Sequence, residues 1–354
     1  MDHEFIYEAL PTHVVFGDGR LAALPAEVDR LGARRALVLS TASQADWARQ
    51  VAGVLGDKCV GIFSEAAMHT PVDVTEKAVK HAQAHDADCV VGLGGGSTIG
   101  LGKAIALRTG LPQIAVPTTY AGSEMTPILG QTENGVKTTQ RTQAVLPKTV
   151  IYDVSLTLSL PAALSATSGL NAMAHAVEAL YAQDRNPIIS LMAEEGIAAL
   201  AQALPGVVAD PQDRGARARA QYGAWLCGIC LGSAGMALHH KLCHVLGGSF
   251  DLPHAETHAV MLPHTAAYNA PATADAMARA ARALGGGDAP RGLYDLAGRI
   301  RAPRSLRELG MPEAGIAKAT ELAMKNPYWN PRPLVEKDIE ALIRRAWAGE
   351  APQA

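Results

Sequence analysis

The sequence predicts two parts, an α/β domain over residues 1–160 with a Rossmann-like parallel sheet and an all-helical domain over residues 161–354. Short apolar runs alternate with alanine-rich helical patterns up to about Pro161. These runs are apolar throughout, which is typical of parallel strands covered on both faces. After Pro161 the runs stop, and helical segments are broken by glycine and proline. A chain of 354 residues is also longer than chains that usually fold around a single hydrophobic core, which favours two domains.

The elements of the first domain follow in order along the chain. Strand-like runs stand at 13–17, 36–40, 59–63, 89–93, 113–119 and 149–153. Helical patterns stand at 20–31, 45–55 and 73–85, with another between the runs at 89–93 and 113–119. Pro25 is expected near the first turn of its helix, and Asp73 is expected to cap the helix that it begins. Asn134–Gly135 predicts a small antiparallel hairpin before the last strand.

The composition excludes several classes of function. Net charge is −3, and the densest basic run, Arg214, Arg217 and Arg219, is interpreted as the solvated face of a helix, so nucleic-acid binding is not expected. No uninterrupted apolar run reaches about 18 residues, so no membrane span is expected. The N-terminus lacks a signal-peptide pattern, which favours the cytoplasm. Charged residues make up 18% against about 25% on average, which favours a homodimer.

Five cysteines in a cytoplasmic chain argue against a disulfide framework. Cys227 and Cys230 have the spacing of a redox pair. They lie in the long apolar run YGAWLCGICLGSAGMAL, however, and no strand–turn context precedes them. We therefore interpret both as core residues.

Two polar loops follow consecutive apolar strands. The first holds Gly94, Gly95, Gly96 and Ser97 between a strand and a helix, and the second holds Thr118, Thr119 and Ser123. Glycines allow a ligand close to the backbone, and N–H groups at a helix start attract phosphate. Plain tight turns are the alternative. Since both loops lie at the carboxyl edge of an open sheet, we expect them to bind a dinucleotide, although neither is a GxGxxG or Walker A motif.

The loop after the second strand bears on the choice between NADH and NADPH. Such a loop normally meets the adenosine ribose, and an acidic residue there selects the free 2′-hydroxyl of NAD. Ser40 and Thr41 occupy it here. Nothing in these two residues repels a 2′-phosphate, so NADPH is expected to be accepted beside NADH.

Six of the twelve histidines lie between residues 239 and 264. A transition-metal site, a set of acids and bases, or an imidazole-rich buried helix would each explain them. His240 and His244 are four residues apart, as are Asn171 and His175 farther upstream. This spacing places each pair on one face of a helix.

The motifs together resemble the iron-containing alcohol dehydrogenases over nearly the whole chain. The matching segments are GGGSTIGLGKAIAL, PTTYAGSEMTPI, HHKLCHVLGGSFDLPHAETHAVMLPH and YWNPRPL. Within that family they are most similar to segments of the maleylacetate reductases. The resemblance implies the architecture shared with dehydroquinate synthase, NADH or NADPH as cofactor, and reduction of maleylacetate, a small dicarboxylate keto acid, to 3-oxoadipate. It also places Lys137 near the adenosine part of the cofactor.

The family's metal positions match Asn171, His175, His240 and His254. Asn171 departs from the pattern, because metal-using members carry an aspartate there and a neutral amide is a poor ligand. Gly100 also stands where the family commonly has aspartate. The resemblance to maleylacetate reductases therefore implies an enzyme without metal, in which these four positions are vestigial.

The histidines are then expected to hold an anion and to donate a proton. His240 or His244 is the candidate proton donor, and His175, His254 and Asn171 are expected in the same cleft. Lys241 and His258 are second candidates for carboxylate contact. His239 and His264 are interpreted as structural, and so is Arg332 in NPRPL.

Three other functions remain open at this point. A metal-dependent alcohol or aldehyde dehydrogenase of the same family is one, and Asn171 argues against it. A lyase similar to dehydroquinate synthase would need a metal and more basic residues. An NAD-binding protein without catalysis is disfavoured by the clustered histidines.

Overall fold

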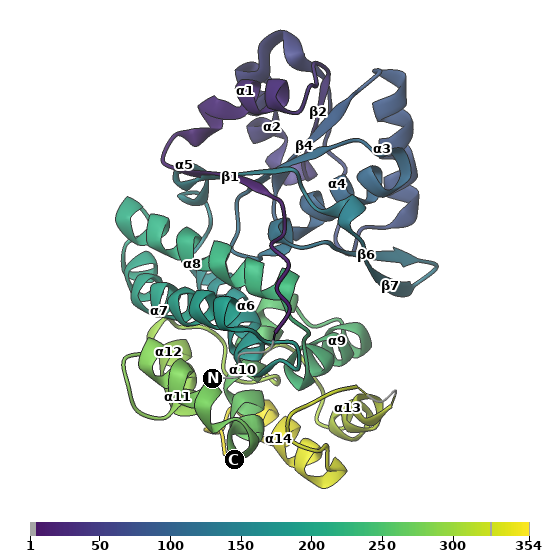
Figure 1. Cartoon of the computed structure of the whole chain (residues 1–354). Helices are drawn as coiled ribbons and strands as arrows, with labels where there is room; N and C mark the ends of the chain where they lie inside the picture. The colour runs from purple at the N-terminus through teal and green to yellow at the C-terminus, as the bar shows by residue number, and fades with distance from the viewer. Residues whose placement is uncertain (1–4, 326–327, 354) are drawn as a thin grey trace. The chain divides into compact units, whose positions relative to one another are not determined.

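The computed structural model describes residues 5–325 and 328–353. The chain forms two compact units. One is Ala9–Leu160, and the other is Pro161–Ala354 together with the N-terminal segment that ends at Glu8. Figure 1 shows strands in the first unit and helices in the second.

The first unit is built on a parallel sheet of six strands, as the continuous apolar runs predict. The strand order is β1-β8-β5-β4-β2-β3. The strands are β1 (His13–Gly17), β2 (Ala36–Leu39), β3 (Cys59–Phe63), β4 (Cys89–Gly94), β5 (Gln113–Pro117) and β8 (Thr149–Asp153). Neighbours β4 and β5 run in register from Val90–Gln113 to Gly94–Pro117, so both strands end at one edge.

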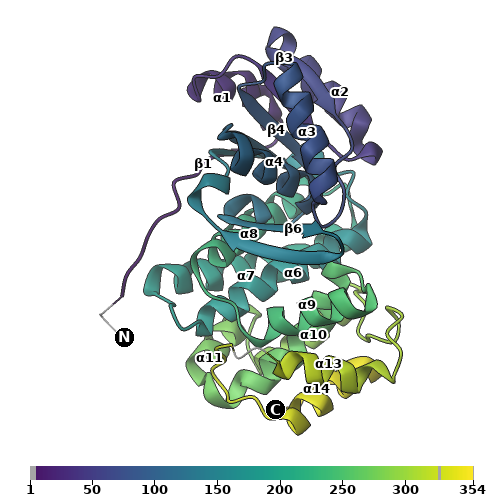
Figure 2. The same ribbon diagram turned by 90° about the vertical axis from the view of Figure 1, so that its right-hand side faces the viewer.

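Helices cover both faces of this sheet, which explains why the strands are apolar throughout. They are α1 (Leu24–Arg30), α2 (Ala45–Leu55), α3 (Val72–Ala84) and α4 (Gly96–Thr109). Strand β2 alternates between the faces: Ala36 and Val38 belong to the core under α1 and α2. Leu37 and Leu39 belong to the core under α3 and α4. In Figure 2 α3 and α4 lie in front of the strands.

Two local predictions in this unit need correction. Residues 20–31 do not form one helix, because a 3-10 turn at Arg20–Ala23 precedes α1; Pro25 does lie in the first turn of α1. Asp73 does not cap α3, because the helix begins one residue earlier and Pro71 stands at the cap. Asp73 still lies in the first turn, where its negative charge interacts favourably with the positive end of the helix dipole.

The hairpin predicted at Asn134–Gly135 is confirmed. It joins β6 (Ile128–Glu133) to β7 (Val136–Arg141) in an antiparallel pair. Asn134 has φ of 50° and Gly135 has φ of 76°. Two central residues with positive φ are the signature of a type I′ turn.

The second unit is helical, as predicted, after the short helix α5 (Val154–Thr157) that ends the first unit. Its helices are α6 (Ala162–Tyr181), α7 (Pro187–Ala209), α8 (Arg214–Ser233), α9 (Leu238–Phe250), α10 (His254–Asn269), α11 (Ala274–Ala283), α12 (Ala289–Arg299), α13 (Gly315–Met324) and α14 (Glu336–Ala348). A core of leucine, isoleucine, methionine and alanine joins α9, α10, α13 and α14. By length and composition alone α7 could span a membrane. It packs against α6 and α8 within the helical unit, however.

Helix α8 corrects one prediction and supports another. Arg217 is fully buried, not on a solvated face, and its Nη1 donates to Ser165 Oγ at 2.6 Å. Arg214 and Arg219 are exposed as expected. Cys227 and Cys230 are both buried and unpaired, which agrees with their interpretation as core residues.

Candidate functional site

The glycine loop lies between β4 and α4 at the carboxyl edge of the sheet. Gly94 has φ of 145°, and a side-chain Cβ there would stand 2.7 Å from Gln44 Oε1 and from Thr98 Oγ1, so only glycine fits. Gly96 is exposed, and a Cβ at its position would meet nothing within 4 Å. Ser97 is half-buried in the first turn of α4. The loop therefore leaves space in front of free N–H groups at the start of a 14-residue helix.

The second loop runs from the end of β5 to the 3-10 turn Ser123–Met125 and meets the first. The Thr118 N–H donates to Gly94 O at 3.1 Å, and Gln44 Nε2 donates to Thr118 Oγ1 at 3.1 Å. Thr119 contacts Gly95, where a Cβ would lie 3.0 Å from its Cγ2. The structure thus brings both glycine-containing loops to one place, as the sequence predicts.

The other residues considered for the cofactor differ in position. Ser40 is fully buried, and its hydroxyl donates to Ser64 Oγ at 2.9 Å. Thr41 is partly exposed and lies 3.0 Å from Ser43 Oγ through its hydroxyl. Of these two residues, Thr41 therefore has surface that a ligand could touch. The side chain of Lys137, on β7, lies outside the described part of the structure.

The histidines gather where α6, α9 and α10 meet in the helical unit. Ring centroids of His240 lie 5.2 Å from His175 and 5.0 Å from His258. His254 lies 4.4 Å from His258, and His244 lies 6.3 Å from His240. His175, His240 and His258 are buried, whereas His244 and His254 are exposed. The five predicted histidines therefore form one cluster.

Glu178 is part of this cluster, and the sequence did not single it out. It is fully buried on α6, three residues after His175. Its Oε2 lies 2.6 Å from His240 Nδ1 and accepts the Ala237 N–H at 3.0 Å, while Oε1 accepts the His239 N–H at 2.9 Å. One carboxylate thus satisfies two N–H groups at the start of α9, those of Ala237 and His239, and orients His240. Glu178 lies on the same face of α6 as Asn171 and His175, and this spacing is the sequence signal that could have identified it as a site residue.

His239 belongs to a hydrogen-bonded chain behind the cluster. Thr265 Oγ1 donates to Met261 O at 3.0 Å, so it accepts from His239 Nδ1, also at 3.0 Å. His239 Nε2 then accepts from His258 Nδ1 at 2.9 Å. The proton of His258 consequently sits on Nδ1, and its Nε2 keeps a lone pair.

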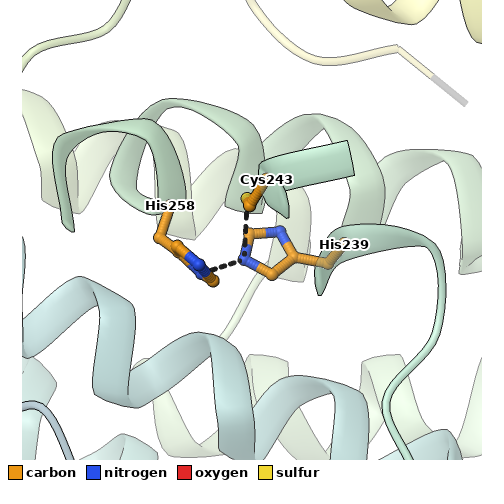
Figure 3. A group of neighbouring side chains, drawn as sticks. All are labelled: His239, Cys243 and His258. Carbon is orange, nitrogen blue, oxygen red and sulfur yellow. Dashed lines mark hydrogen bonds between the residues drawn. The ribbon is translucent and has the colours of Figure 1, made fainter. Parts of the chain in front are cut away.

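Figure 3 shows His239 and His258 with Cys243, a trio whose ligand atoms lie within 4.8 Å of one another. Two nitrogens bound to one tetrahedral zinc at about 2.0–2.1 Å would stand about 3.3–3.4 Å apart. The 2.9 Å between His239 Nε2 and His258 Nδ1 is shorter and is a hydrogen bond. Burial also raises the pKa of the Cys243 thiol, which opposes the thiolate that a metal needs. The trio is therefore a packed hydrogen-bonded group.

The family's metal positions offer a donor set that contains no carboxylate. Asn171 Oδ1, His175 Nδ1 and His240 Nε2 are buried without a hydrogen-bond partner. Burial, followed by the neighbouring histidines, holds the pKa values of His175 and His258 well below their ordinary range. Glu178 is not free to replace the missing carboxylate ligand, since its oxygens already accept bonds from α9. This donor set does not fit a ferrous ion, which prefers an anionic oxygen ligand beside imidazoles.

The remaining candidates lie around this cluster. Lys241 is half-buried, with Nζ 5.5 Å from the centre of the Tyr328 ring. His264 is buried as a core residue would be, but neither of its ring nitrogens has a hydrogen-bond partner. Arg332 donates to Tyr268 O at 2.9 Å and pairs with Asp338 at 3.2 Å, which agrees with its interpretation as structural.

Gly100 stands where the family commonly has an aspartate, and in this chain Thr70 lies against that position. A Cβ at Gly100 would stand 2.4 Å from Thr70 Oγ1, closer than any real contact. Thr70 is buried in a left-handed conformation, with φ of 48°. The Thr70 hydroxyl therefore occupies the space that an aspartate side chain would need.

Comparison with known proteins agrees with this geometry. Residues 11–154 match the iron-containing alcohol dehydrogenase model, and residues 165–347 match the C-terminal model of the same family. Maleylacetate reductases of Rhizobium sp. (strain MTP-10005) and Sphingobium indicum are 60% and 58% identical, each covering 99% of both chains. The crystal structure of maleylacetate reductase from Agrobacterium tumefaciens has a TM-score of 0.97 at 59% identity, covering 99% of this chain and 100% of that one. The chain therefore belongs to the iron-containing alcohol dehydrogenase family.

Proposed function

We propose that the chain is a maleylacetate reductase, which uses NADH or NADPH to reduce the carbon–carbon double bond of maleylacetate to give 3-oxoadipate. The observation that carries this proposal is full-length identity of up to 60% to maleylacetate reductases, combined with Asn171 and unpartnered histidine nitrogens at the family's metal positions. The nicotinamide cofactor, when bound, supplies the hydride. The two glycine-containing loops and the start of α4 are proposed to hold its phosphates.

The reaction places two demands on the protein. A hydride added to the alkene carbon β to the ketone leaves an enolate, whose oxygen needs a hydrogen-bond donor and whose α carbon needs a proton. Two substrate carboxylates must also be held. Neutral or cationic nitrogen donors suit both demands, and an aspartate at position 171 would repel the substrate.

We assign the proton donor to His240. Glu178 Oε2 sits 2.6 Å from its Nδ1, so the carboxylate fixes the ring and offsets positive charge when Nε2 carries a proton. His175 and Asn171 line the same side of α6 and are assigned to the enolate oxygen. The exposed His244 and His254 and the half-buried Lys241 are assigned to the carboxylates.

The sequence suggested that His258 contacts a substrate carboxylate, but its hydrogen bonds favour a different role. Its Nδ1 proton is held by His239, so Nε2 offers a lone pair, which repels a carboxylate. We propose that His258 accepts a hydrogen bond within the cluster and so orients the neighbouring imidazoles.

We further propose that no metal takes part, that NADPH serves beside NADH, and that the enzyme is a cytoplasmic homodimer. Asn171 supports the first point, and the absence of an acid at Ser40 and Thr41 supports the second. Exposed Phe5, Ile6 and Tyr7 support the dimer, since apolar side chains in water favour burial against a partner. Light scattering after gel filtration would measure the assembly, and a monomer would remove that part of the proposal.

The function is tested by following NADH consumption with maleylacetate and with simple aldehydes. Turnover of maleylacetate with 3-oxoadipate as the product supports the proposal. Preference for an aldehyde would instead favour a metal-dependent dehydrogenase of the same family.

A further inference from the structure

Lys103 is a fully buried cation in the middle of α4. Its Nζ donates to Ser123 O at 2.6 Å, Thr126 O at 2.8 Å and Ile128 O at 2.9 Å. Thr126 Oγ1 is a further acceptor at 2.9 Å. All of these oxygens belong to the chain between the end of β5 and the start of β6. Among the described residues, the ion pairs do not include Lys103.

The geometry is that of a charged ammonium held by oxygens. An ammonium has three donors and no acceptor, and three backbone carbonyls surround this one at hydrogen-bond distance. A neutral amine would have only two donors and would leave one buried carbonyl unpaired. Burying an ammonium is costly, so it persists only where several polar partners compensate for lost water. Lys103 thus stands where a bound monovalent cation with oxygen ligands could stand.

Helix α4 is itself held firmly against the sheet at this point. A Cβ at Gly102, the residue before Lys103, would stand 2.2 Å from Gln113 Nε2 of β5. The same Gln113 nitrogen donates to Ile99 O of α4 at 3.2 Å. The helix that starts with the glycine loop therefore has a fixed distance to β5. Lys103 extends this rigid support to the loop that follows β5.

That loop carries the second set of polar groups proposed to meet the cofactor. Ser123 is in it, and Ser123 Oγ is 3.4 Å from Lys103 Nζ in addition to the bonded carbonyl. Glu124, buried beside it, accepts the Tyr152 hydroxyl at 2.9 Å and has its other oxygen unpartnered. Burial lowers the pKa of Lys103 to about 7, and the nearby Glu124 carboxyl opposes that shift in part.

We propose that Lys103 is a positioning residue for the nicotinamide cofactor. Its tethered ammonium does the work of a bound monovalent cation, holding the loop after β5 in the shape that receives the nucleotide. This inference rests on the proposed use of NADH or NADPH. Lys103 does not touch the cofactor in this account; it acts through Ser123 and Thr126.

The test is cation rescue of the Lys103→Ala variant. NADH affinity is measured by fluorescence titration, together with KM for NADH and kcat with maleylacetate. Each is measured with ammonium or potassium chloride and with tetramethylammonium chloride at the same ionic strength. Lys58→Ala is the control, since Lys58 forms an exposed pair with Asp29.

The expected result is a rise of about tenfold in Kd and KM for NADH in Lys103→Ala, from three unpaired buried carbonyls, with little change in kcat at saturating NADH. Ammonium or potassium should reverse most of this rise, and tetramethylammonium, too large for the space, should not. Wild-type affinity in a folded Lys103→Ala would overturn the proposal, and so would a loss that neither small cation reverses.

Lys103→Met serves if the alanine variant does not fold, because it keeps the apolar stem and removes only the charge. It should show the same rise in Kd, and wild-type affinity in this variant would overturn the proposal. The wild-type assay with maleylacetate decides the proposed function separately. An inactive wild type that still binds NADH would refute that function and leave the comparison of Lys103 variants intact.

Discussion

Glu178→Gln is the perturbation that most directly tests the organisation of the histidine cluster. The substitution keeps the size of the side chain and removes its charge. In the wild type, both carboxylate oxygens accept hydrogen bonds from the start of α9, at 2.6 to 3.0 Å. An amide has one accepting oxygen and one donating NH₂ group. Whichever way it turns, a donor of α9 then faces another donor.

The magnitude follows from that mismatch. A buried N–H left without a partner costs about 1–3 kcal/mol, which is the expected loss in the free energy of unfolding. If the NH₂ group faces His240, it holds that ring with its proton on Nε2 and offers no negative charge to offset imidazolium. Loss of a correctly held acid or base slows proton transfer by about 10²–10⁴-fold. We therefore expect kcat to fall by at least about a hundredfold, while KM for NADH stays near the wild-type value.

The assay is steady-state NADH oxidation with maleylacetate, alongside urea unfolding of each variant. Glu194→Gln is the matched control, since Glu194 pairs with Arg279 on the surface of α7 and should leave kcat unchanged. A folded Glu178→Gln variant with wild-type kcat would refute the assigned role of Glu178 and, with it, the choice of His240 as the proton donor.

Three further predictions concern the core, the glycine loop and the metal positions. Burial and then Arg345 lower the pKa of His264 from 6.5 to about 4, so the unfolded chain takes up this proton first as pH falls. The free energy of unfolding of the wild type should therefore fall by about 3 kcal/mol as the pH is lowered from 6.5 to about 4. Urea unfolding should show a smaller loss for His264→Leu over the same pH range. Equal losses in the two proteins would contradict this prediction. Gly94→Ala should lower stability by about 1–3 kcal/mol because of its φ and the crowded Cβ, whereas Gly96→Ala should fold normally and bind NADH more weakly. Tight NADH binding by Gly96→Ala would show that phosphate does not approach there. Asn171→Asp should bind zinc more tightly by calorimetry and turn over maleylacetate about tenfold more slowly or worse, through charge repulsion; unchanged turnover would argue against a repulsion role for position 171.

The fold could be predicted from the sequence because its signals are local and repeated. Continuous apolar strands followed by helices lead to a covered parallel sheet, and Asn134–Gly135 leads to one turn type. The predictions were wrong for residues whose type is compatible with more than one position in a helix. Arg217 reads as solvated beside Arg214, yet it is the residue on the inward face of α8 and is buried. Asp73 has the chemistry of a cap, but α3 begins at Val72 and Pro71 stands at the cap.

The candidate site was predicted in part. The i, i+4 spacing predicts that Asn171 and His175 share one face of a helix, and in the structure His175 of α6 lies 5.2 Å from His240 of α9. Glu178 was not predicted as a site residue, because a single glutamate in an apolar helix forms no recognisable sequence motif. Its importance arises only when the start of α9 is brought against it, a long-range contact that spacing does not encode. The same holds for His239, whose bonds to Thr265 and His258 depend on tertiary packing.

Metal-independent reduction of maleylacetate is tested most directly by an assay on enzyme dialysed against a strong chelator, with metal content measured in the same sample. NADH-dependent formation of 3-oxoadipate is expected at the untreated rate, with far less than one metal ion per chain. Loss of activity on chelation, restored by a stoichiometric divalent ion, would contradict it.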